Sequence, residues 1–378
     1  MMSRERKTSN VYFRILLVFL FLYLFLVSIG LMSAAFKGFG ADFAENLIRT
    51  TSNPFVGLFI GILATSLVQS SSTTTSVVVG LVSSGVLTIE HGIPIIMGAN
   101  IGTTVTNTLV SMGHITRKEE FKRAFAGAMV HDFFNLICVA IMFPLEIMTG
   151  FLHKLATGLS GLFEDAGGIT LISPVKIATK PVIDFIVNLF TKIFSFSDEL
   201  SYILVFIASI LLLFFSLYYI VRIMKSLIYR KTETVMSNIL ERKGMIIGIF
   251  AGLIFTAIVQ SSSITTSLLV PLIGAGILTI EVAFPITMGA NIGTTTTAIL
   301  ASFATGDISA ITIAFVHFLF NVIGVCIIFP IKIFRQLALY LAKGIGEIAV
   351  RNRKYAIVYV LCIFFVIPAL LIVISNLI

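Results

Sequence analysis

The residues of this sequence that are best suited to chemistry are two short runs of hydroxyl side chains. Gln-Ser-Ser-Ser occurs at 69–72 and again at 260–263, and further serines and threonines follow each copy as far as Ser76 and Ser267. Both copies lie inside long apolar stretches. A membrane interior has no water to satisfy hydroxyl and amide groups, so each of them costs free energy unless something polar meets it. The pattern therefore predicts that both runs face one polar ligand.

The composition places these runs in a membrane protein. Of 378 residues, 57% are hydrophobic and 12% are charged, and the mean hydropathy is +1.06. Soluble domains carry about 25% charged residues. The net charge of +8 indicates basic cytoplasmic loops rather than nucleic-acid binding. The expected fold class is therefore an all-α polytopic protein of the plasma membrane. We expect the lipid bilayer to be its partner and do not expect it to bind nucleic acid.

The hydroxyl runs divide their apolar stretches into halves that are too short to cross a membrane. The halves of the first stretch, 55–68 and about 76–87, each hold fewer than the roughly 17 apolar residues that a span requires. Two half-length helices that meet at a polar tip predict a re-entrant helical hairpin over 55–88, and a second over 245–279. One continuous tilted helix with a polar stripe is the alternative.

The remaining apolar stretches predict full spans. Glycines on both sides of Asn100 and of Asn291 predict a segment that is either unwound or closely packed, so broken helices are expected there. The expected spans cover about 11–33, 92–112, 124–145, 200–221, 284–303, 308–330 and 356–376.

The chain contains an internal repeat. Gln69 and Gln260 are 191 residues apart, and Asn100 and Asn291 keep the same offset. With the N-terminus inside and each hairpin counted as no crossing, 20 of the 26 Lys and Arg fall in segments predicted to lie inside. The two repeats then have opposite orientations, as in secondary transporters with a site at the midplane. The predicted units are an N-terminal span and connection (1–53), repeat one (54–148), a connector with one span and a basic segment (149–243), repeat two (244–331), and a basic interfacial segment with the last span (332–378).

Several stretches around the two runs match the motifs of a known family. They include both Gln-Ser-Ser-Ser copies and the segments 94–103, 105–108, 123–132 and 288–300. On these motifs the sequence resembles the type II sodium-dependent phosphate cotransporters, over about 54–150 and 245–330. The connector lacks the large cysteine-containing outside loop of animal members, which indicates a bacterial member. The resemblance implies symport of inorganic phosphate and sodium, the coupling ion, into the cell by alternating access.

This resemblance suggests roles for the polar side chains. Hydroxyls and helix N-termini can donate to phosphate, while amide and hydroxyl oxygens can coordinate sodium. The predicted phosphate ligands are Ser70, Ser71, Ser72, Thr73, Ser261, Ser262, Ser263, Asn100 and Asn291. The predicted sodium ligands are Gln69, Gln260, Thr75, Thr103, Thr104, Thr266, Thr294 and Thr295.

Other interpretations of these residues stay open. The transported ion could be another oxyanion such as sulfate, the driving ion could be a proton, and the assembly could be a homodimer. A serine hydrolase in the membrane would need a base beside the serines, and His131 and His317 are the available bases, but we expect them to be structural and the protein not to be an enzyme. Asp132 is a sodium ligand, a proton site or an interfacial charge.

Overall fold

A computed structural model describes residues 2–165, 174–193, 197–241 and 244–375, and this part of the chain contains helices and no strand. The all-α prediction is therefore confirmed. Arg242, Lys243 and the centre of the connector, residues 166–173, lie outside the described residues. In chain order the elements are α1 (Met2–Gly38), α2 (Ala41–Thr51), α3 (Pro54–Val68), α4 (Ser71–Ser83), α5 (Ile89–Gly102), α6 (Thr104–Met112), α7 (Lys118–Thr149), α8 (Phe151–Asp165), α9 (Pro174–Asn188), the π-helical turn η1 (Leu189–Ile193), α10 (Asp198–Glu241), α11 (Met245–Val259), α12 (Ser262–Gly274), α13 (Ile280–Thr305), α14 (Ile308–Ile328), α15 (Lys332–Arg351), α16 (Arg353–Leu361), the π-helical turn η2 (Cys362–Val366) and α17 (Ile367–Ser375).

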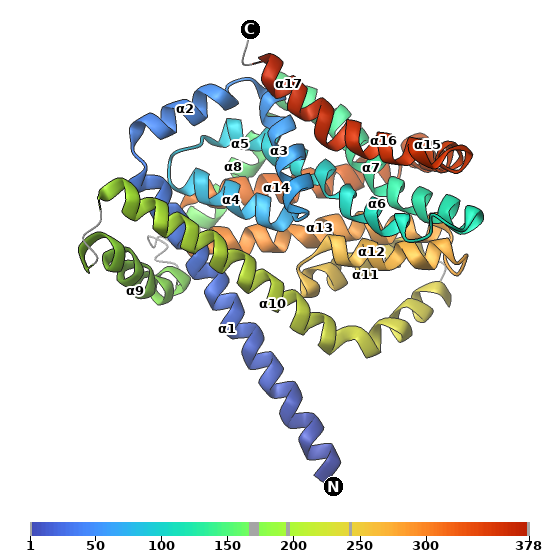
Figure 1. Cartoon of the computed structure of the whole chain (residues 1–378), viewed down its shortest axis with the longest axis horizontal. Helices are drawn as coiled ribbons and strands as arrows, with labels where there is room; N and C mark the ends of the chain where they lie inside the picture. The colour runs from blue at the N-terminus through green and yellow to red at the C-terminus, as the bar shows by residue number, and fades with distance from the viewer. Residues whose placement is uncertain (1, 166–173, 194–196, 242–243, 376–378) are drawn as a thin grey trace.

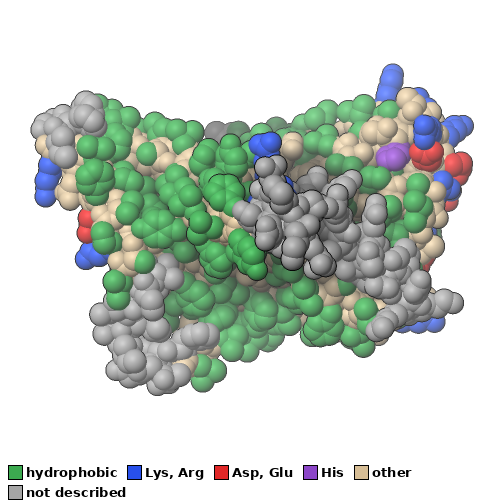
Figure 2. Space-filling model, turned by 90° about the horizontal axis from the view of Figure 1, so that it is seen from below, with side chains coloured by type: hydrophobic (Ala, Val, Ile, Leu, Met, Phe, Trp, Pro, Cys, Tyr) green, Lys and Arg blue, Asp and Glu red, His purple; other side chains and the backbone are tan. Residues whose placement is uncertain are grey.

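The apolar helices agree with a polytopic membrane protein. In the described residues, six segments are long and apolar enough to cross a bilayer, and the bent pair α2–α3, with an angle of 101°, would add a seventh. Figure 2 shows a broad band of hydrophobic side chains, with most charged side chains toward the two ends of the molecule. The six segments are Tyr12–Gly38, Ile89–Met112, Lys118–Thr149, Glu199–Met224, Ile308–Ile328 and Arg353–Ser375. Six of the seven spans expected from the sequence thus have a counterpart, and the seventh coincides with α13.

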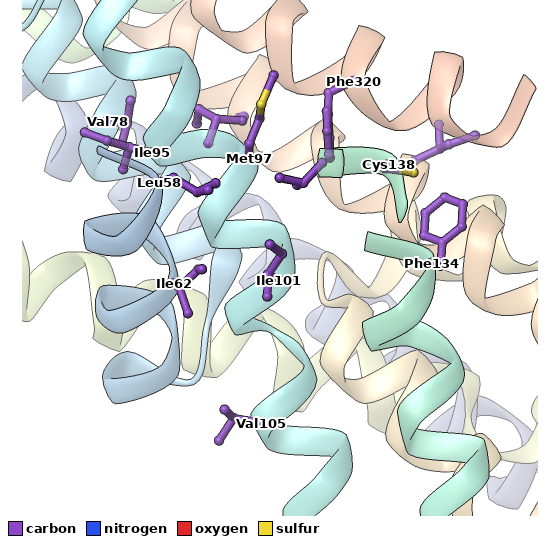
Figure 3. Packing of buried hydrophobic residues seen from close by; sticks show 14 of the residues in the cluster. Leu58, Ile62, Val78, Ile95, Met97, Ile101, Val105, Phe134, Cys138 and Phe320 are labelled. Carbon is purple, nitrogen blue, oxygen red and sulfur yellow. The ribbon is translucent and has the colours of Figure 1, made fainter. Parts of the chain in front are cut away.

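Glycines bring the helices of each repeat into close backbone contact. α3 packs along α5, and α11 packs along α13 (Figure 1). A Cβ atom on Gly98 would collide with the carbonyl oxygen of Leu58, and one on Gly289 would collide with that of Ile249. Figure 3 shows Leu58 of α3 and Ile101 of α5 in the apolar core that fills the remaining space.

These glycine segments are closely packed and not unwound. α5 stays helical as far as Gly102, and α13 is one continuous helix through its own glycines. The expectation of a broken helix is therefore confirmed in repeat one, where α5 ends at Gly102 and α6 begins at Thr104, and is wrong in repeat two, where α13 continues through the motif. Glycine serves here to let two backbones approach each other, which does not require the helix to open.

The two repeats also interlock. α4 of the first repeat packs against α13 and α14 of the second, while α12 of the second packs against α6 and α7 of the first. The second helix of each hairpin is thus held by the opposite repeat. The inversion of the repeats across a membrane and the re-entrant path of the hairpins remain predictions.

Candidate functional site

The first hydroxyl run begins where one helix ends and another starts. α3 ends at Val68, and Gln69 takes a left-handed conformation with φ of 56° while its N–H donates to the Thr65 carbonyl at 2.7 Å. Ser70 caps α4, because its Oγ accepts from the N–H of Thr73 at 3.2 Å. The alternative of one continuous tilted helix is wrong, because Gln69 leaves the helix and Ser70 satisfies an N–H group of a new one.

The second run has the same construction. Gln260 is left-handed with φ of 58°, and Ser261 caps α12 by accepting from the N–H of Ile264 at 3.4 Å. The hydroxyls of Thr256 and Thr265 bond at 2.6 Å across the hairpin, and an equivalent bond of 2.9 Å joins α3 and α4. In the described chain, the two glutamines are the non-glycine residues with positive φ. Strained backbone of this kind gathers at functional sites.

The two helix N-termini meet at one place. The Ser72 hydroxyl donates to the backbone carbonyl of Gln260 at 3.3 Å, across 188 residues of sequence. Ser71, Ser72 and Ser262 are only 3–6% exposed, whereas Ser70, Ser261 and Ser263 are half-buried. The first N–H groups of a helix have no acceptor within the helix and carry a partial positive charge. Two such ends beside buried hydroxyls form a setting that favours an anion.

The hairpins themselves carry no basic side chain. The sequence has no Lys or Arg between Arg49 and Arg117, or between Lys243 and Lys332. These intervals contain both hairpins and the segments around Asn100 and Asn291. An anion bound between the helix ends would therefore gain from a bound cation, since these segments supply only partial positive charges.

A buried hydrogen-bond network joins the repeats beside the helix tips. His131 Nε2 lies 2.8 Å from Asn291 Oδ1, and Asn291 Nδ2 donates to Asn135 Oδ1 at 2.8 Å. The hydroxyl of Thr104 lies 2.8 Å from His131 Nδ1. Because an amide oxygen only accepts, His131 donates through Nε2 and accepts from Thr104 through Nδ1. Both the oxygen and the nitrogen of the Asn291 side-chain amide are thus hydrogen-bonded.

The opposite half of this network is looser. Asn321 Nδ2 donates to Asn100 Oδ1 at 3.2 Å, and Asn135 Nδ2 donates to the Asn100 carbonyl at 3.2 Å. His317 is fully buried, yet neither ring nitrogen has a hydrogen-bond partner in the described residues. Asn100 of repeat one therefore bonds α14 of repeat two, and Asn291 of repeat two bonds α7 of repeat one. His131 thus bonds side chains of two other helices, whereas His317 has no such bond in the described part of the chain.

The predicted sodium ligands fall into two groups. At the tips, Thr266 donates to Asn107 Oδ1 at 2.7 Å, Thr75 bonds the Ser72 carbonyl at 3.2 Å, and Gln260 Oε1 is buried without a hydrogen-bond partner among the described residues. Gln69 is exposed. Beside the asparagines, the threonine hydroxyls bond carbonyls of their own helix at 2.7–3.0 Å, as is common for threonine in apolar helices. These are Thr103, Thr294 and Thr295.

Asp132 is fully buried in α7. Tyr359 of α16 donates its hydroxyl to Asp132 Oδ2, whereas Oδ1 has no partner among the described residues. Asp132 is therefore not a solvent-exposed charge, and its role as a sodium ligand or proton site stays a prediction. Sequence reasoning missed Tyr359, and no local signal pointed to it, because the two residues are 227 positions apart.

Asn107 is a second residue whose role the sequence analysis did not assign. It accepts from Thr266 of the opposite repeat, and its Nδ2 is buried without a partner in the described chain. The family motif at 105–108 was a signal that could have found it. Asn107 brings an amide group from repeat one directly to the tip of repeat two.

Comparison with known proteins identifies the family of this chain. The model of the family described as Na+/Pi-cotransporter matches residues 24–163 and 211–348, which include both hydroxyl runs and the network between the repeats. The chain belongs to the Na+/Pi-cotransporter family. The family resemblance noted from the sequence motifs is thus confirmed.

Relatives in this family match most of the chain. "Sodium-dependent phosphate transport protein 2B" of Homo sapiens is 35% identical in an alignment 443 positions long. The alignment covers 94% of this chain and 64% of that protein. "Sodium-dependent phosphate transport protein 2A" of Ovis aries is 34% identical in an alignment 441 positions long, which covers 98% of this chain and 69% of the relative. The chain thus spans about two thirds of the length of such relatives. No solved structure shows a significant match.

Proposed function

We propose that this protein is a secondary active transporter of the plasma membrane that couples sodium to the uptake of inorganic phosphate. The observation that carries the proposal is the meeting of two capped helix N-termini that are lined by buried hydroxyls and belong to hairpins with no Lys or Arg in their sequence. Membership of the Na+/Pi-cotransporter family and relatives named as sodium-dependent phosphate transport proteins support the same substrate and ion.

Phosphate would bind where the N-termini of α4 and α12 approach each other. The hydroxyls of Ser71, Ser72, Ser262 and Ser263, together with the first N–H groups of both helices, supply donors from two directions. Each hydrogen bond to a charged oxygen contributes about 1.5–3 kcal/mol. Asn100 and Asn291 act differently in this proposal, because their amides connect the repeats instead of facing the tips.

Sodium would bind beside the phosphate. Gln260 Oε1 is buried without a hydrogen-bond partner in the described residues, and Thr266 and Asn107 lie at the same tip. Such oxygens are the ligands that sodium uses in transporters. Because neither ion finds a full opposite charge at the tips, each lowers the free-energy cost of binding the other, and this mutual dependence is the basis of coupling.

Transport would follow from the way in which each repeat packs against a hairpin helix of the other. Each hairpin contributes one helix that rests on the opposite repeat, so a movement of one repeat alters the access to both tips. In an inverted arrangement, this movement would expose the tips alternately to the two sides of the membrane. Assembly as a homodimer also remains a proposal.

Uptake of radiolabelled phosphate into proteoliposomes tests the proposal. Uptake should require an inward sodium gradient, and it should stay low when choline replaces sodium, even with an inward proton gradient. Competition by excess sulfate should be weak. Phosphate uptake driven by protons alone, or equal competition by sulfate, would replace the proposed ion or substrate by one of the alternatives.

The hydrolase alternative is disfavoured by the positions of the histidines. Both ring nitrogens of His131 are engaged by Thr104 and Asn291, not by a serine of either run. Neither ring nitrogen of His317 has a hydrogen-bond partner among the described residues, so His317 does not bond a serine either. A serine nucleophile needs a base within hydrogen-bond reach. We therefore retain transport as the proposed function.

A further inference from the structure

A cavity lies away from the helix tips, at the other end of α12. Its volume is about 470 Å³, and it opens between α7, α15 and the turn that joins α12 to α13. Its charged lining consists of Lys122, Arg123, Glu281, Lys343 and Glu347. The proposed transport site uses none of these residues, so the cavity requires its own explanation.

The charges of this cavity leave one cation without an acidic partner. Lys122 pairs with Glu347 at 3.1 Å, and Lys343 pairs with Glu281 at 2.6 Å. Arg123 forms no ion pair with any described residue, and its Nε donates to the carbonyl of Gly274 at 2.9 Å. That bond holds the guanidinium at the cavity and leaves its two terminal nitrogens as donors. A guanidinium presents these donors in a geometry that matches a phosphate group.

Apart from Thr279, the uncharged side chains of the lining are apolar, and exposed apolar side chains lie close to them in the sequence. Ile273, Leu278 and Ile280 form the inner wall. Ile277, which lies between the lining residues Gly276 and Leu278, is 61% exposed, and Tyr340 on α15 is 75% exposed. In a membrane protein, exposed apolar side chains of this kind contact lipid. The cavity therefore combines a cationic group with an exposed isoleucine in the turn that lines it.

The cavity lies at the end of the molecule that the charge pattern assigns to the cytoplasm. The count of Lys and Arg assigns the basic loop 113–123 and the basic segment 332–354 to the inside. The two segments meet where Arg353 Nη2 donates to the Thr116 carbonyl at 3.4 Å. Figure 1 shows α15 beside α7 at this end. Basic pockets between membrane helices on the cytoplasmic side are suited to lipid headgroups.

We propose that this cavity binds the phosphodiester headgroup of an anionic phospholipid of the inner leaflet, with Arg123 as its principal contact. A free phosphate ester would share the same contact with Arg123. The apolar rim favours a lipid, since a soluble ester has no apolar part to place against Ile277. The proposal concerns a site separate from transport and does not depend on the transported ion.

The absence of tryptophan from this sequence permits a direct test. Ile277→Trp places a single fluorophore at the rim, and Leu211→Trp, at a 65% exposed position on α10, serves as the matched control. The reporter proteins are reconstituted in phosphatidylcholine that contains either brominated phosphatidylglycerol or brominated phosphatidylcholine as quencher. We expect phosphatidylglycerol to bind about five times more strongly at position 277, the preference expected of one cation near the surface. At position 211 the two lipids should quench equally.

Two further substitutions should change this preference in opposite directions. Arg123→Gln should reduce the ratio of phosphatidylglycerol binding to phosphatidylcholine binding to about one, because the unpaired cation is lost. Glu281→Gln should raise it, because Lys343 is then released from its ion pair. A variant that merely loses structure would not gain lipid selectivity, so the second substitution controls for misfolding.

Several results would overturn the proposal. Equal quenching at position 277 by both lipids, or the same preference at position 211, would show that no specific site exists. A preference that survives Arg123→Gln would place the lipid elsewhere. Loss of the preference on addition of millimolar glycerol phosphate would identify a soluble phosphate ester as the ligand.

Discussion

Replacement of Asn291 by alanine tests whether its buried amide connects the repeats or binds phosphate. The substitution removes two hydrogen bonds of 2.8 Å, to His131 and to Asn135. All three side chains are at most 3% exposed, so the abandoned partner atoms cannot turn to water. A neutral hydrogen bond contributes about 0.5–1.5 kcal/mol, and bonds between membrane helices average about 0.6 kcal/mol. The free energy of unfolding should therefore fall by about 1–3 kcal/mol.

Two measurements on the same protein preparation separate these roles. Unfolding in detergent mixtures of increasing SDS content gives the change in stability, and uptake in proteoliposomes gives the apparent KM for phosphate. If Asn291 connects the repeats, stability should fall while the KM stays within about twofold of the original value, because the remaining folded protein keeps its helix tips intact.

Asn321→Ala is the matched control for this experiment. It removes one bond between the repeats, the longer 3.2 Å contact with Asn100, so its effect on stability should be about half as large. A KM raised tenfold by Asn291→Ala without loss of stability would contradict the reasoning, and would restore Asn291 as a phosphate ligand. Unchanged stability and unchanged KM would show that the network between the repeats contributes little.

Three further predictions address the tips and the packing. Ser72→Ala should raise the apparent KM for phosphate by about tenfold or more, since a hydrogen bond to a charged group contributes about 1.5–3 kcal/mol; an unchanged KM in uptake assays would exclude this hydroxyl. Gln260→Ala should raise the sodium concentration needed for half-maximal uptake while the phosphate KM at saturating sodium changes little; unaltered sodium activation would remove Gln260 from the sodium site. Gly98→Ala should prevent folding, because its Cβ would collide with the Leu58 carbonyl. Gly158→Ala is the control, because a Cβ at that position meets open space. Equal yields of monodisperse protein from both variants would refute the packing argument.

Much of the helix architecture follows from local sequence. The division of the apolar stretches was accessible, because helix starts and stops depend on residues within one turn of the boundary. The structure then identified Ser70 and Ser261 as the N-caps. The 191-residue offset likewise exposed the repeat, and both hairpins have the same left-handed glutamine and the same hydroxyl bond.

Local patterns were less informative where glycine has more than one use. The glycines around Asn100 and Asn291 permitted either an unwound segment or close packing, and the sequence could not choose between them. The neighbouring helices decide the matter: the carbonyls of Leu58 and Ile249 occupy the space that a Cβ would need. Glycine was required by a neighbour's backbone and not by its own dihedral angles.

The sequence by itself determined the class of the protein, its repeat, the helix breaks and the polar residues from which the site is built. Only the tertiary structure decided which of these residues meet. Asn291 bonds His131 across 160 residues, and Asp132 bonds Tyr359 across 227. Such pairs depend on how whole helices pack against each other, and packing is set by the summed contacts of many side chains. A spacing rule describes only neighbours along one helix, so it can propose the members of a buried network but not their partners.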